Sequence, residues 1–413
     1  VDLARLRGEI LRDVRPVVGV GQRGVDLLGR LIDGYGVLTT GCHEQQTTVN
    51  PVTDSSTTPD IAARLREIDD VTLDDTVTFA DLTTLHLGGK PRLTVRCGTD
   101  SAVAEVVMLL DALAVPLLIV GGGSNLVVAD GDLDLVAVVV ENTEVTVSGH
   151  GLVRADAGAV WDDVVLASVE AGLGGIECLS GIPGSAGATP VQNVGAYGAE
   201  ISDVLVQVLL LERDTGEMAW VPAADLDLAY RYSNLKFTGR GIVLAIELQL
   251  HPGGQSAPLR YGELARRLGA TEGGERRPVA DVREAVLDLR RGKGMVVDAD
   301  DHDTWSAGSF FTNPIVPTTL ADAVQAEVRA RRGDEDADRM PRFAAGGGAE
   351  GQVKLSAAWL IDRAGYDKGY PGEGAPVRLS TKHTLALTNR GQAVTDDLVA
   401  LAREVRDGVR DAF

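Results

Sequence analysis

The segment from Gly181 to Gly198 most constrains what this chain can fold into. It reads Gly-Ile-Pro-Gly-Ser-Ala-Gly-Ala-Thr-Pro-Val-Gln-Asn-Val-Gly-Ala-Tyr-Gly, and its apolar residues follow neither a helical nor a strand period. Such a segment cannot bury an apolar face, so we expect a long loop whose backbone N–H and C=O groups approach a non-protein ligand. Long loops held by a regular scaffold are more often functional than idle.

A second glycine-rich loop follows a short apolar run. Residues 116–120 (Pro-Leu-Leu-Ile-Val) predict a strand, and Gly121, Gly122, Gly123, Ser124, Asn125 and Leu126 come directly after it. Successive glycines let backbone amides converge on an anion, so a phosphate or diphosphate is the expected ligand. The P-loop signature is absent, and Leu126 stands at the third glycine position of the dinucleotide fingerprint. A tight turn between two strands is the structural alternative.

Composition limits the class of protein. A chain of 413 residues predicts one large domain or two to three smaller ones. Its net charge of −21 disfavours binding to nucleic acid or to an acidic membrane surface. No apolar run is long enough to span a bilayer, and the first residues lack an export signal, so we expect a cytoplasmic protein without membrane insertion.

The cysteines and histidines predict no metal site. Cys42, Cys97 and Cys178 lie far apart without metal-ligand spacing, and the six histidines are not clustered. Cys97 and Cys178 are expected to be small buried apolar residues, in a reducing compartment.

Strand and helix patterns alternate from Val71 onward and predict an α+β protein. We divide the chain into residues 1–70, 71–140, 141–298 and 299–413, and regard the first as a flexible extension with helical pattern and a polar linker. A short helix is expected over residues 61–68. Near the carboxyl end we expect helices over 354–364 and 396–411 and a strand over 384–388.

Two segments carry side chains suited to chemistry. Ser309 stands between a glycine and two phenylalanines, where a hydroxyl in a dry pocket can hand over a proton. The alternative is a strand-start turn with both rings in the core, and the nucleophile-elbow pattern is not met. Arg231 can hold a carboxylate in a bidentate fork, or lie solvated at a strand end.

Taken in order, these segments resemble the UDP-N-acetylenolpyruvoylglucosamine reductase family. The two glycine loops, residues 230–233 (Tyr-Arg-Tyr-Ser) and residues 308–314 (Gly-Ser-Phe-Phe-Thr-Asn-Pro) occur in the family's order. Residues 82–90 are similar to its opening segment and residues 354–362 to its helix near the carboxyl end. The resemblance begins at about Leu73, and the family is one of enzymes that complete the peptidoglycan precursor UDP-N-acetylmuramate.

The resemblance implies a flavoprotein. Residues 71–140 and 141–298 would be two α/β subdomains of a vanillyl-alcohol-oxidase-like FAD-binding fold, and residues 299–413 a smaller α+β substrate-binding domain. NADPH would reduce the flavin, and the enolpyruvyl substrate would then take a hydride at C3 from flavin N5. The implied FAD contacts lie in the two loops: Gly121, Gly122, Gly123, Ser124, Asn125, Leu126, Gly181, Ile182, Pro183, Gly184, Gly187, Gln192, Asn193, Gly195, Ala196 and Tyr197.

The resemblance also assigns roles at the substrate. Arg231 matches the arginine that stabilises negative charge on C2 and its carboxylate, and Ser309 matches the proton donor to C2. The implied substrate contacts are Tyr230, Tyr261, Lys293 and Asn313. Tyr261 is similar to a tyrosine that closes over the substrate diphosphate in one subtype, so that subtype is expected. The expected partners are the sugar nucleotide and NADPH alone, and the expected state is a monomer.

Two departures from the family pattern leave alternatives open. The family's catalytic glutamate lies in a Pro-Glu segment after the last helix, and the sequence stops at Phe413 before that segment could appear. The expectation is a truncated chain or an impaired last step, so a catalytically impaired homologue that binds flavin and sugar nucleotide is the first alternative. A flavin oxidase of another substrate is the second. The other departure is the extension before Leu73, which the family usually lacks.

Overall fold

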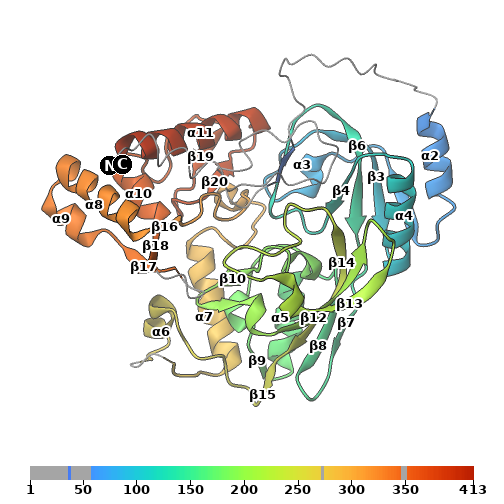
Figure 1. Ribbon diagram of the computed structural model, residues 1–413, viewed down its shortest axis with the longest axis horizontal. Helices are drawn as coiled ribbons and strands as arrows, with labels where there is room; N and C mark the ends of the chain where they lie inside the picture. Colours follow the sequence, from blue (N-terminus) through green and yellow to red (C-terminus); the bar gives the residue numbers. More distant parts are fainter. Residues whose placement is uncertain (1–35, 39–56, 271–273, 346–350) are drawn as a thin grey trace.

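The described residues of the computed structural model are 36–38, 57–270, 274–345 and 351–413 (Figure 1). They form two neighbouring β-sheets, followed by a carboxyl-terminal group of helices and short strands. Figure 1 shows this last group, coloured orange to red, on the side of the molecule opposite α2 (Thr57–Leu65) and α4 (Asp100–Ala112). The cysteine Cys42 and residues 39–56 of the polar linker predicted over 39–60 lie outside the described residues, whereas residues 57–60 begin α2.

The first sheet is built from valine-rich strands in the order β2-β3-β6-β4. β3 and β4 both run parallel to β6, and β2 runs antiparallel to β3. The strands are β2 (Val71–Asp74), β3 (Lys90–Cys97), β4 (Leu117–Val120) and β6 (Asp132–Val140). Parallel strands buried on both faces read as continuous apolar runs, which is the pattern at the end of β6.

Helix α4 covers this sheet because its apolar residues recur at helical spacing. Its buried Val103, Val106 and Leu110 share one core cluster with strand residues of the sheet. Thr99 caps the helix, since its side chain accepts a hydrogen bond from the Ala102 backbone N–H. Ile61 of α2 belongs to the same cluster.

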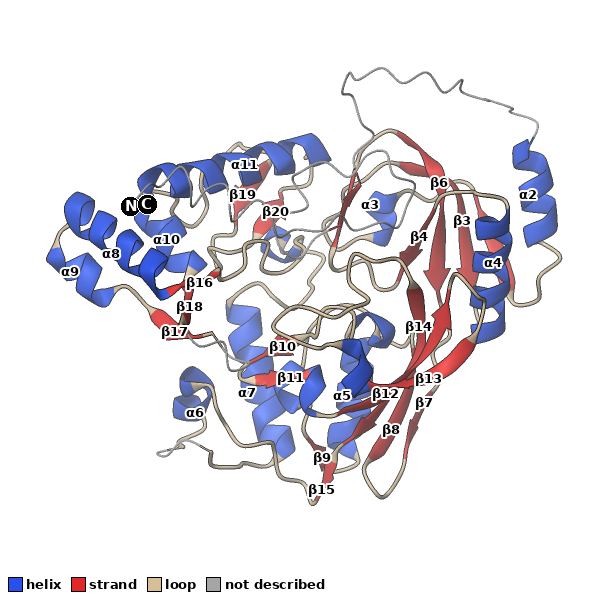
Figure 2. Ribbon diagram, viewed as in Figure 1, coloured by secondary structure: helices blue, strands red, loops and turns tan. Residues whose placement is uncertain are grey.

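The second sheet is antiparallel, in the order β13-β12-β14-β8-β7. Helices α5 (Trp161–Glu170) and α7 (Val279–Gly292) contribute to its core cluster (Figure 2). The strands are β7 (Val145–Val147), β8 (Leu152–Asp156), β12 (Leu205–Glu212), β13 (Met218–Pro222) and β14 (Gly241–Gln249). The long glycine loop runs between α5 and β12.

The carboxyl-terminal group contains two small antiparallel sheets. β18 lies between β16 and β17, and β19 pairs with β20. Helices α8 (Thr318–Arg332) and α9 (Asp334–Arg339) accompany the first sheet, and α11 (Thr395–Ala412) packs on the second. The strands are β16 (Ile315–Pro317), β17 (Arg342–Ala344), β18 (Gln352–Leu355), β19 (Val377–Leu379) and β20 (Leu387–Asn389).

Short elements complete the described chain. The helices are α3 (Phe79–Leu82), α6 (Gly262–Arg267) and α10 (Ala357–Arg363). The strands are β1 (Gly36–Leu38), β5 (Leu126–Val128), β9 (Leu173–Gly174), β10 (Gly195–Ala196), β11 (Ala199–Glu200) and β15 (His251–Pro252).

Three predicted elements were placed wrongly. The helix expected over 354–364 begins only at Ala357, because Lys354 and Leu355 belong to β18 and Ser356 caps the helix. The strand expected over 384–388 begins at Leu387, since residues before it form a turn. The short helix expected over 61–68 begins earlier and ends at Leu65.

The prediction for two cysteines is confirmed. Cys97 and Cys178 are buried and carry free thiols, and burial raises the pKa of each to about 12.

Candidate active site

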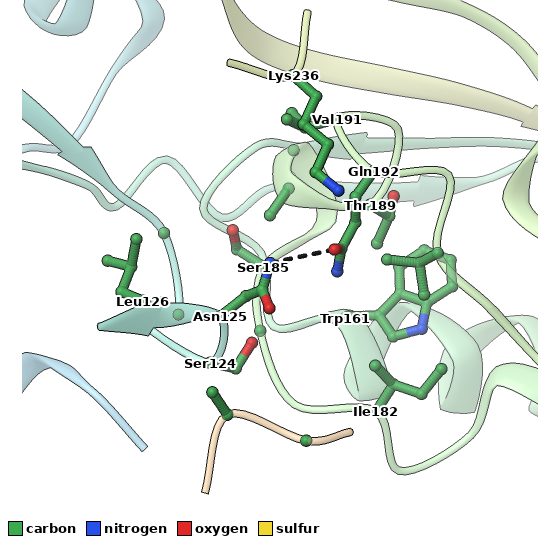
Figure 3. A pocket seen from close by; sticks show the side chains of 18 of the residues that line it. Ser124, Asn125, Leu126, Trp161, Ile182, Ser185, Thr189, Val191, Gln192 and Lys236 are labelled. Carbon is green, nitrogen blue, oxygen red and sulfur yellow. Dashed lines mark hydrogen bonds between the residues drawn. The ribbon is translucent and has the colours of Figure 1, made fainter. Parts of the chain in front are cut away.

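One cavity of about 700 Å³ lies between the two sheets' glycine loops and the carboxyl-terminal group. Cavities of this size are typical of cofactor and ligand sites. All of residues 121–126 line it, as does most of residues 182–196. Figure 3 shows side chains from these loops, with Trp161 and Lys236, around the open space.

The two glycine loops contact each other directly. Ser124 Oγ donates a hydrogen bond of 2.8 Å to the Pro183 carbonyl, and Asn125 Nδ2 donates one of 3.1 Å to Gln192 Oε1 (Figure 3). A Cβ on Gly122 would lie 2.6 Å from the Gly184 Cα, so a side chain there is excluded by backbone. The glycines are therefore needed for the loops to pack against each other as well as to expose backbone to the cavity.

Arg231 lines the cavity in a left-handed backbone conformation, with φ of 55°. Non-glycine residues in this region are strained and cluster at functional sites. Its guanidinium donates hydrogen bonds to the Gly195 carbonyl at 2.5 Å and, at 3.4 Å, to the Asn193 carbonyl. Its charge lies 5.0 Å from the Tyr230 ring, and Lys354 lies 4.6 Å from the same ring. Arg231 therefore brings a positive charge to the cavity, although the chain as a whole is acidic.

Ser309 reaches the cavity from the opposite side. Phe310 is buried behind it and its backbone N–H donates a 2.7 Å hydrogen bond to the Leu385 carbonyl, which fixes the turn. The alternative, with both rings in the core, holds for Phe310 but not for Phe311, which is half-buried and lines the cavity, and the Ser309 side chain stays exposed there. Its Oγ lies 3.0 Å from Nε2 of His383.

A second polar cluster lies on α6 and the end of α7. Lys293 Nζ donates a 2.9 Å hydrogen bond to Glu263, and it lies 5.7 Å from the Tyr197 ring. Burial opposes the charge of Lys293, but the Glu263 contact raises its pKa above the ordinary value. The Lys293 hydrogen bond likewise lowers the pKa of Glu263. The exposed Tyr261 ring meets Tyr197 edge-on at 5.3 Å.

The structure brings most of the predicted site residues to the one cavity. Most of the predicted glycine-loop residues line it, and so do Tyr230, Arg231, Ser309 and Asn313. Gly181, Asn193, Tyr197, Tyr261 and Lys293 do not line it. Asn193 is buried, and its side-chain Nδ2 donates hydrogen bonds to the Glu200 carboxylate and the Ala229 carbonyl. These bonds hold the loop to neighbouring segments rather than contact the cavity.

Arg290 is a cavity residue outside the predicted set of site residues. It is 9% exposed, and it donates hydrogen bonds to the carbonyls of Gly181 at 3.2 Å and Met295 at 2.6 Å. Its Nε has no hydrogen-bond partner among the described residues. Burial lowers its pKa to about 10, so it remains a cation at neutral pH. A buried cation with an unpaired N–H at a cavity suits an anionic or carbonyl-bearing ligand.

Other lining residues also lie outside the predicted set of site residues. Ser185, Thr189 and Lys236 line the cavity. Ser185 and Thr189 are small polar residues inside the predicted loop, so the loop itself was the available signal. Within the part of the chain that the structure describes, no group of three or more His, Cys, Asp or Glu residues could hold a metal ion. No helix among those residues is long and apolar enough to cross a membrane.

Comparisons with known proteins agree with this geometry. Residues 91–221 match the family model for an FAD binding domain, and residues 300–413 match the carboxyl-terminal domain of UDP-N-acetylenolpyruvoylglucosamine reductase. The chain is 66% identical to the reductase of that name from Corynebacterium diphtheriae over 372 residues, which is 89% of this chain and 95% of the relative. It is 65% identical to reductase 2 of Corynebacterium glutamicum over 87% of this chain and 95% of that one.

A solved structure shares the fold. The crystal structure of the reductase from Thermus caldophilus superposes with a TM-score of 0.55 at 23% identity, over 82% of this chain and 94% of that one. The architecture is α+β, with an FAD-binding domain and a separate carboxyl-terminal domain. Because the identity to relatives is high over most of their length, the chain belongs to the UDP-N-acetylenolpyruvoylglucosamine reductase family.

Proposed function

We propose that this chain reduces the enolpyruvyl group of UDP-N-acetylglucosamine enolpyruvate to give UDP-N-acetylmuramate, with FAD as bound cofactor and NADPH as co-substrate. The observation that carries the proposal is one cavity lined by both glycine loops, Arg231 and Ser309. Relatives 65–66% identical over most of their length bear the name of this reductase, which supports an active enzyme rather than an impaired homologue.

The two loops are the proposed FAD site. The successive glycines 121–123 line the cavity beside Pro183 and Gly184 of the second loop, an arrangement of backbone that suits a diphosphate. The buried Arg290 adds a positive charge on the same cavity. When bound, FAD supplies hydride transfer between NADPH and the carbon–carbon double bond. Gly181, Asn193 and Tyr197 do not line the cavity, so they would support the conformation of the second loop rather than contact the FAD.

Arg231 is proposed to stabilise the negative charge that builds on C2 and the adjacent carboxylate. A planar guanidinium matches a carboxylate in two parallel hydrogen bonds. Its bonds to the Gly195 and Asn193 carbonyls hold it in place before substrate arrives, so little reorganisation is needed. Such preorganised electrostatic stabilisation is worth about 3 kcal/mol per well-placed donor.

Ser309 is proposed to donate the proton to C2. A serine hydroxyl is a weak acid, but the acceptor here is a strongly basic carbon, so the transfer is favourable. The glycine before it and the buried Phe310 after it hold the hydroxyl at the cavity. Tyr230 and Asn313, which line the same cavity, are proposed to contact the substrate.

Three finer assignments extend this proposal. Tyr261 is exposed and Lys293 lies nearby through Tyr197, which supports the subtype whose tyrosine loop closes over the substrate diphosphate. We also propose a monomer acting in the cytoplasm. Light scattering of the purified chain, with and without the sugar nucleotide, tests whether it is a monomer.

Anaerobic mixing experiments test the function. NADPH should bleach the flavin, and the enolpyruvyl sugar nucleotide should restore its colour while UDP-N-acetylmuramate appears. UDP-N-acetylglucosamine, which lacks the enolpyruvyl group, is the matched control and should restore nothing. Bleaching by NADPH without return of colour would support the impaired homologue. Bleaching of the oxidised flavin by an alcohol or hydroxy acid, with no reoxidation by the sugar nucleotide, would support the oxidase.

A further inference from the structure

His383 contacts the hydroxyl to which the proposed function assigns the proton transfer. Its Nε2 lies 3.0 Å from Ser309 Oγ, across 74 residues of sequence. The imidazole is partly buried and does not itself line the cavity. A residue at this position can orient the Ser309 hydroxyl without contacting the substrate itself.

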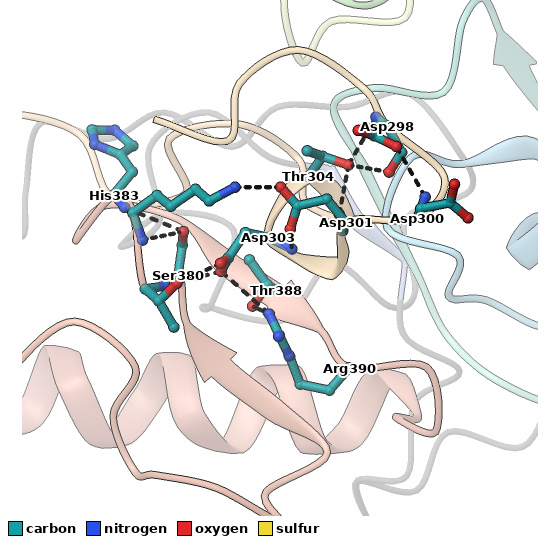
Figure 4. Close-up of polar contacts among 11 residues, drawn as sticks. Asp298, Asp300, Asp301, Asp303, Thr304, Ser380, His383, Thr388 and Arg390 are labelled. Carbon is teal, nitrogen blue, oxygen red and sulfur yellow. Dashed lines mark hydrogen bonds and ion pairs between the residues drawn. The ribbon is translucent and has the colours of Figure 1, made fainter. Parts of the chain in front are cut away.

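Hydrogen bonds to buried side chains fix the turn that carries His383 (Figure 4). Ser380 is fully buried, and its Oγ accepts hydrogen bonds from the backbone N–H groups of Lys382 at 3.0 Å and His383 at 3.2 Å. Thr381 N donates a 2.9 Å hydrogen bond to the buried Asp303. The Lys382 ammonium pairs with Asp301.

Asp303 lies six residues before Ser309 on the same segment and accepts the Thr381 hydrogen bond from the turn that carries His383. Its carboxylate therefore links the two segments that meet at the Ser309–His383 contact. Its carboxylate also pairs with Arg390 at 3.2 Å. Burial disfavours its charge, but hydrogen bonds from Thr381 lower its pKa below the ordinary value, so it stays a carboxylate. Further along, Phe310 N bonds the Leu385 carbonyl and Asn389 N bonds the Trp305 carbonyl. These bonds fix the Ser309 turn and the His383 turn against each other.

We propose that His383 is a positioning residue for Ser309, with Nε2–H donating a hydrogen bond to Oγ so that the serine hydrogen points into the cavity. This rests on the proposed proton transfer. With one lone pair of Oγ occupied from behind, the hydroxyl hydrogen turns toward the substrate C2. As that proton leaves, the same N–H stabilises the oxygen's negative charge, and water returns a proton to Oγ after the product forms.

The charge state of the imidazole agrees with this arrangement. Burial lowers the pKa of His383 to about 4, and the positive charges of Lys293, Lys368 and Arg290 contribute to the same shift. The ring is therefore neutral at physiological pH and carries one N–H. A neutral ring hydrogen-bonds Ser309 without adding a charge to the cavity.

Paired substitutions test the proposal on the holoenzyme. His383→Gln keeps an amide N–H near the position of Nε2, while the amide of His383→Asn is one bond too short to reach Oγ. Reoxidation of the reduced flavin by the enolpyruvyl substrate should slow about 10- to 100-fold in His383→Asn and stay within about threefold in His383→Gln. FAD content and the rate of flavin reduction by NADPH should be unchanged in both. The exposed His251, replaced by Asn, is the control.

A double-mutant cycle separates positioning from every other role. In a Ser309→Ala background, His383→Asn should cause no further slowing, because the group it positions is absent. The same slowing with and without Ser309 would overturn the proposal, and so would a His383→Asn enzyme that reoxidises at the wild-type rate. If the wild-type enzyme itself were not reoxidised by the enolpyruvyl substrate, the proposed function would fail instead, and the two failures are distinct.

Discussion

Asn125 in the first glycine loop and Gln192 in the second share a hydrogen bond of 3.1 Å from Nδ2 to Oε1. It joins two segments that are 67 residues apart in sequence and line one cavity. The bond fixes the distance between the two glycine loops before any ligand is present. Preorganisation of this kind lowers the ordering cost of binding.

Loss of that bond should weaken FAD binding. A typical hydrogen bond contributes about 0.5–1.5 kcal/mol, so Asn125→Ala and Gln192→Ala should each raise the dissociation constant of FAD by about 2- to 12-fold. Titration of apoprotein with FAD, followed by flavin fluorescence, measures it. The double variant should be less than additive; fully additive losses would show that the two amides act separately.

Gly122 should tolerate no side chain. In Gly122→Ala the new Cβ would lie 2.6 Å from the Gly184 Cα and 2.8 Å from its carbonyl carbon. Overpacking of this kind costs about 1–3 kcal/mol, so FAD affinity should fall by about 5-fold or more. Gly149→Ala is the matched control, because nothing lies within 4 Å of a Cβ there. Equal FAD affinity in the two variants would contradict the packed-loop geometry.

Local sequence signals predicted the scaffold of this site well. The strand expected over 116–120 and the helix expected over 396–411 were foreseen almost to the residue, as β4 and α11, because their apolar residues follow a clear strand or helical pattern. The short strand β18 was missed because Lys354 and Leu355 continue the helical pattern of α10 toward its start. A strand of this length is specified by its partners β16 and β17 rather than by its own residues.

Side-chain contacts between distant segments could not be predicted. The Ser309–His383 contact depends on how two loops are bonded through Asp303, and no spacing in the sequence encodes that. Arg290 shows the same limit. Its sequence context is a charged helix end, whereas in the structure it is a buried cation at the cavity. The family resemblance supplied roles for Arg231 and Ser309 that the residues alone left open.

Removal of the Ser309 hydroxyl should separate the two half-reactions. Ser309→Ala should leave flavin reduction by NADPH intact and slow reoxidation by the enolpyruvyl substrate by about 100-fold or more, as expected for loss of a general acid. Stopped-flow absorbance of the flavin measures both steps. An unchanged oxidative step would remove Ser309 from the mechanism.

Arg231→Lys should reduce turnover although the charge is kept. A lysine ammonium cannot make two parallel hydrogen bonds to a carboxylate, nor reach both the Gly195 and Asn193 carbonyls in the same way. Loss of about 3 kcal/mol of transition-state stabilisation corresponds to about 100-fold in kcat. Steady-state kinetics should show the loss in kcat more than in KM. Arg331→Lys, at an exposed helix position paired with Glu327, is the control and should behave as wild type.

His383 should make the stability of the holoenzyme fall as the solution becomes acidic. Its folded pKa of about 4 lies below the ordinary value of 6.5, so between these values the unfolded chain binds more protons than the folded one. Its effect on the free energy of unfolding is therefore flat above the ordinary pKa and becomes unfavourable as the pH falls through this range. His383→Gln lacks the titration, while all other groups are shared. The unfolding free energy of the wild type should thus drop relative to that of His383→Gln by on the order of 1 kcal/mol between about pH 7 and pH 5. Denaturant titrations of both proteins, with FAD in excess, measure the difference. Parallel pH profiles would mean that the imidazole is protonated as easily in the folded protein as in the unfolded chain, and hence that it is not neutral beside Ser309.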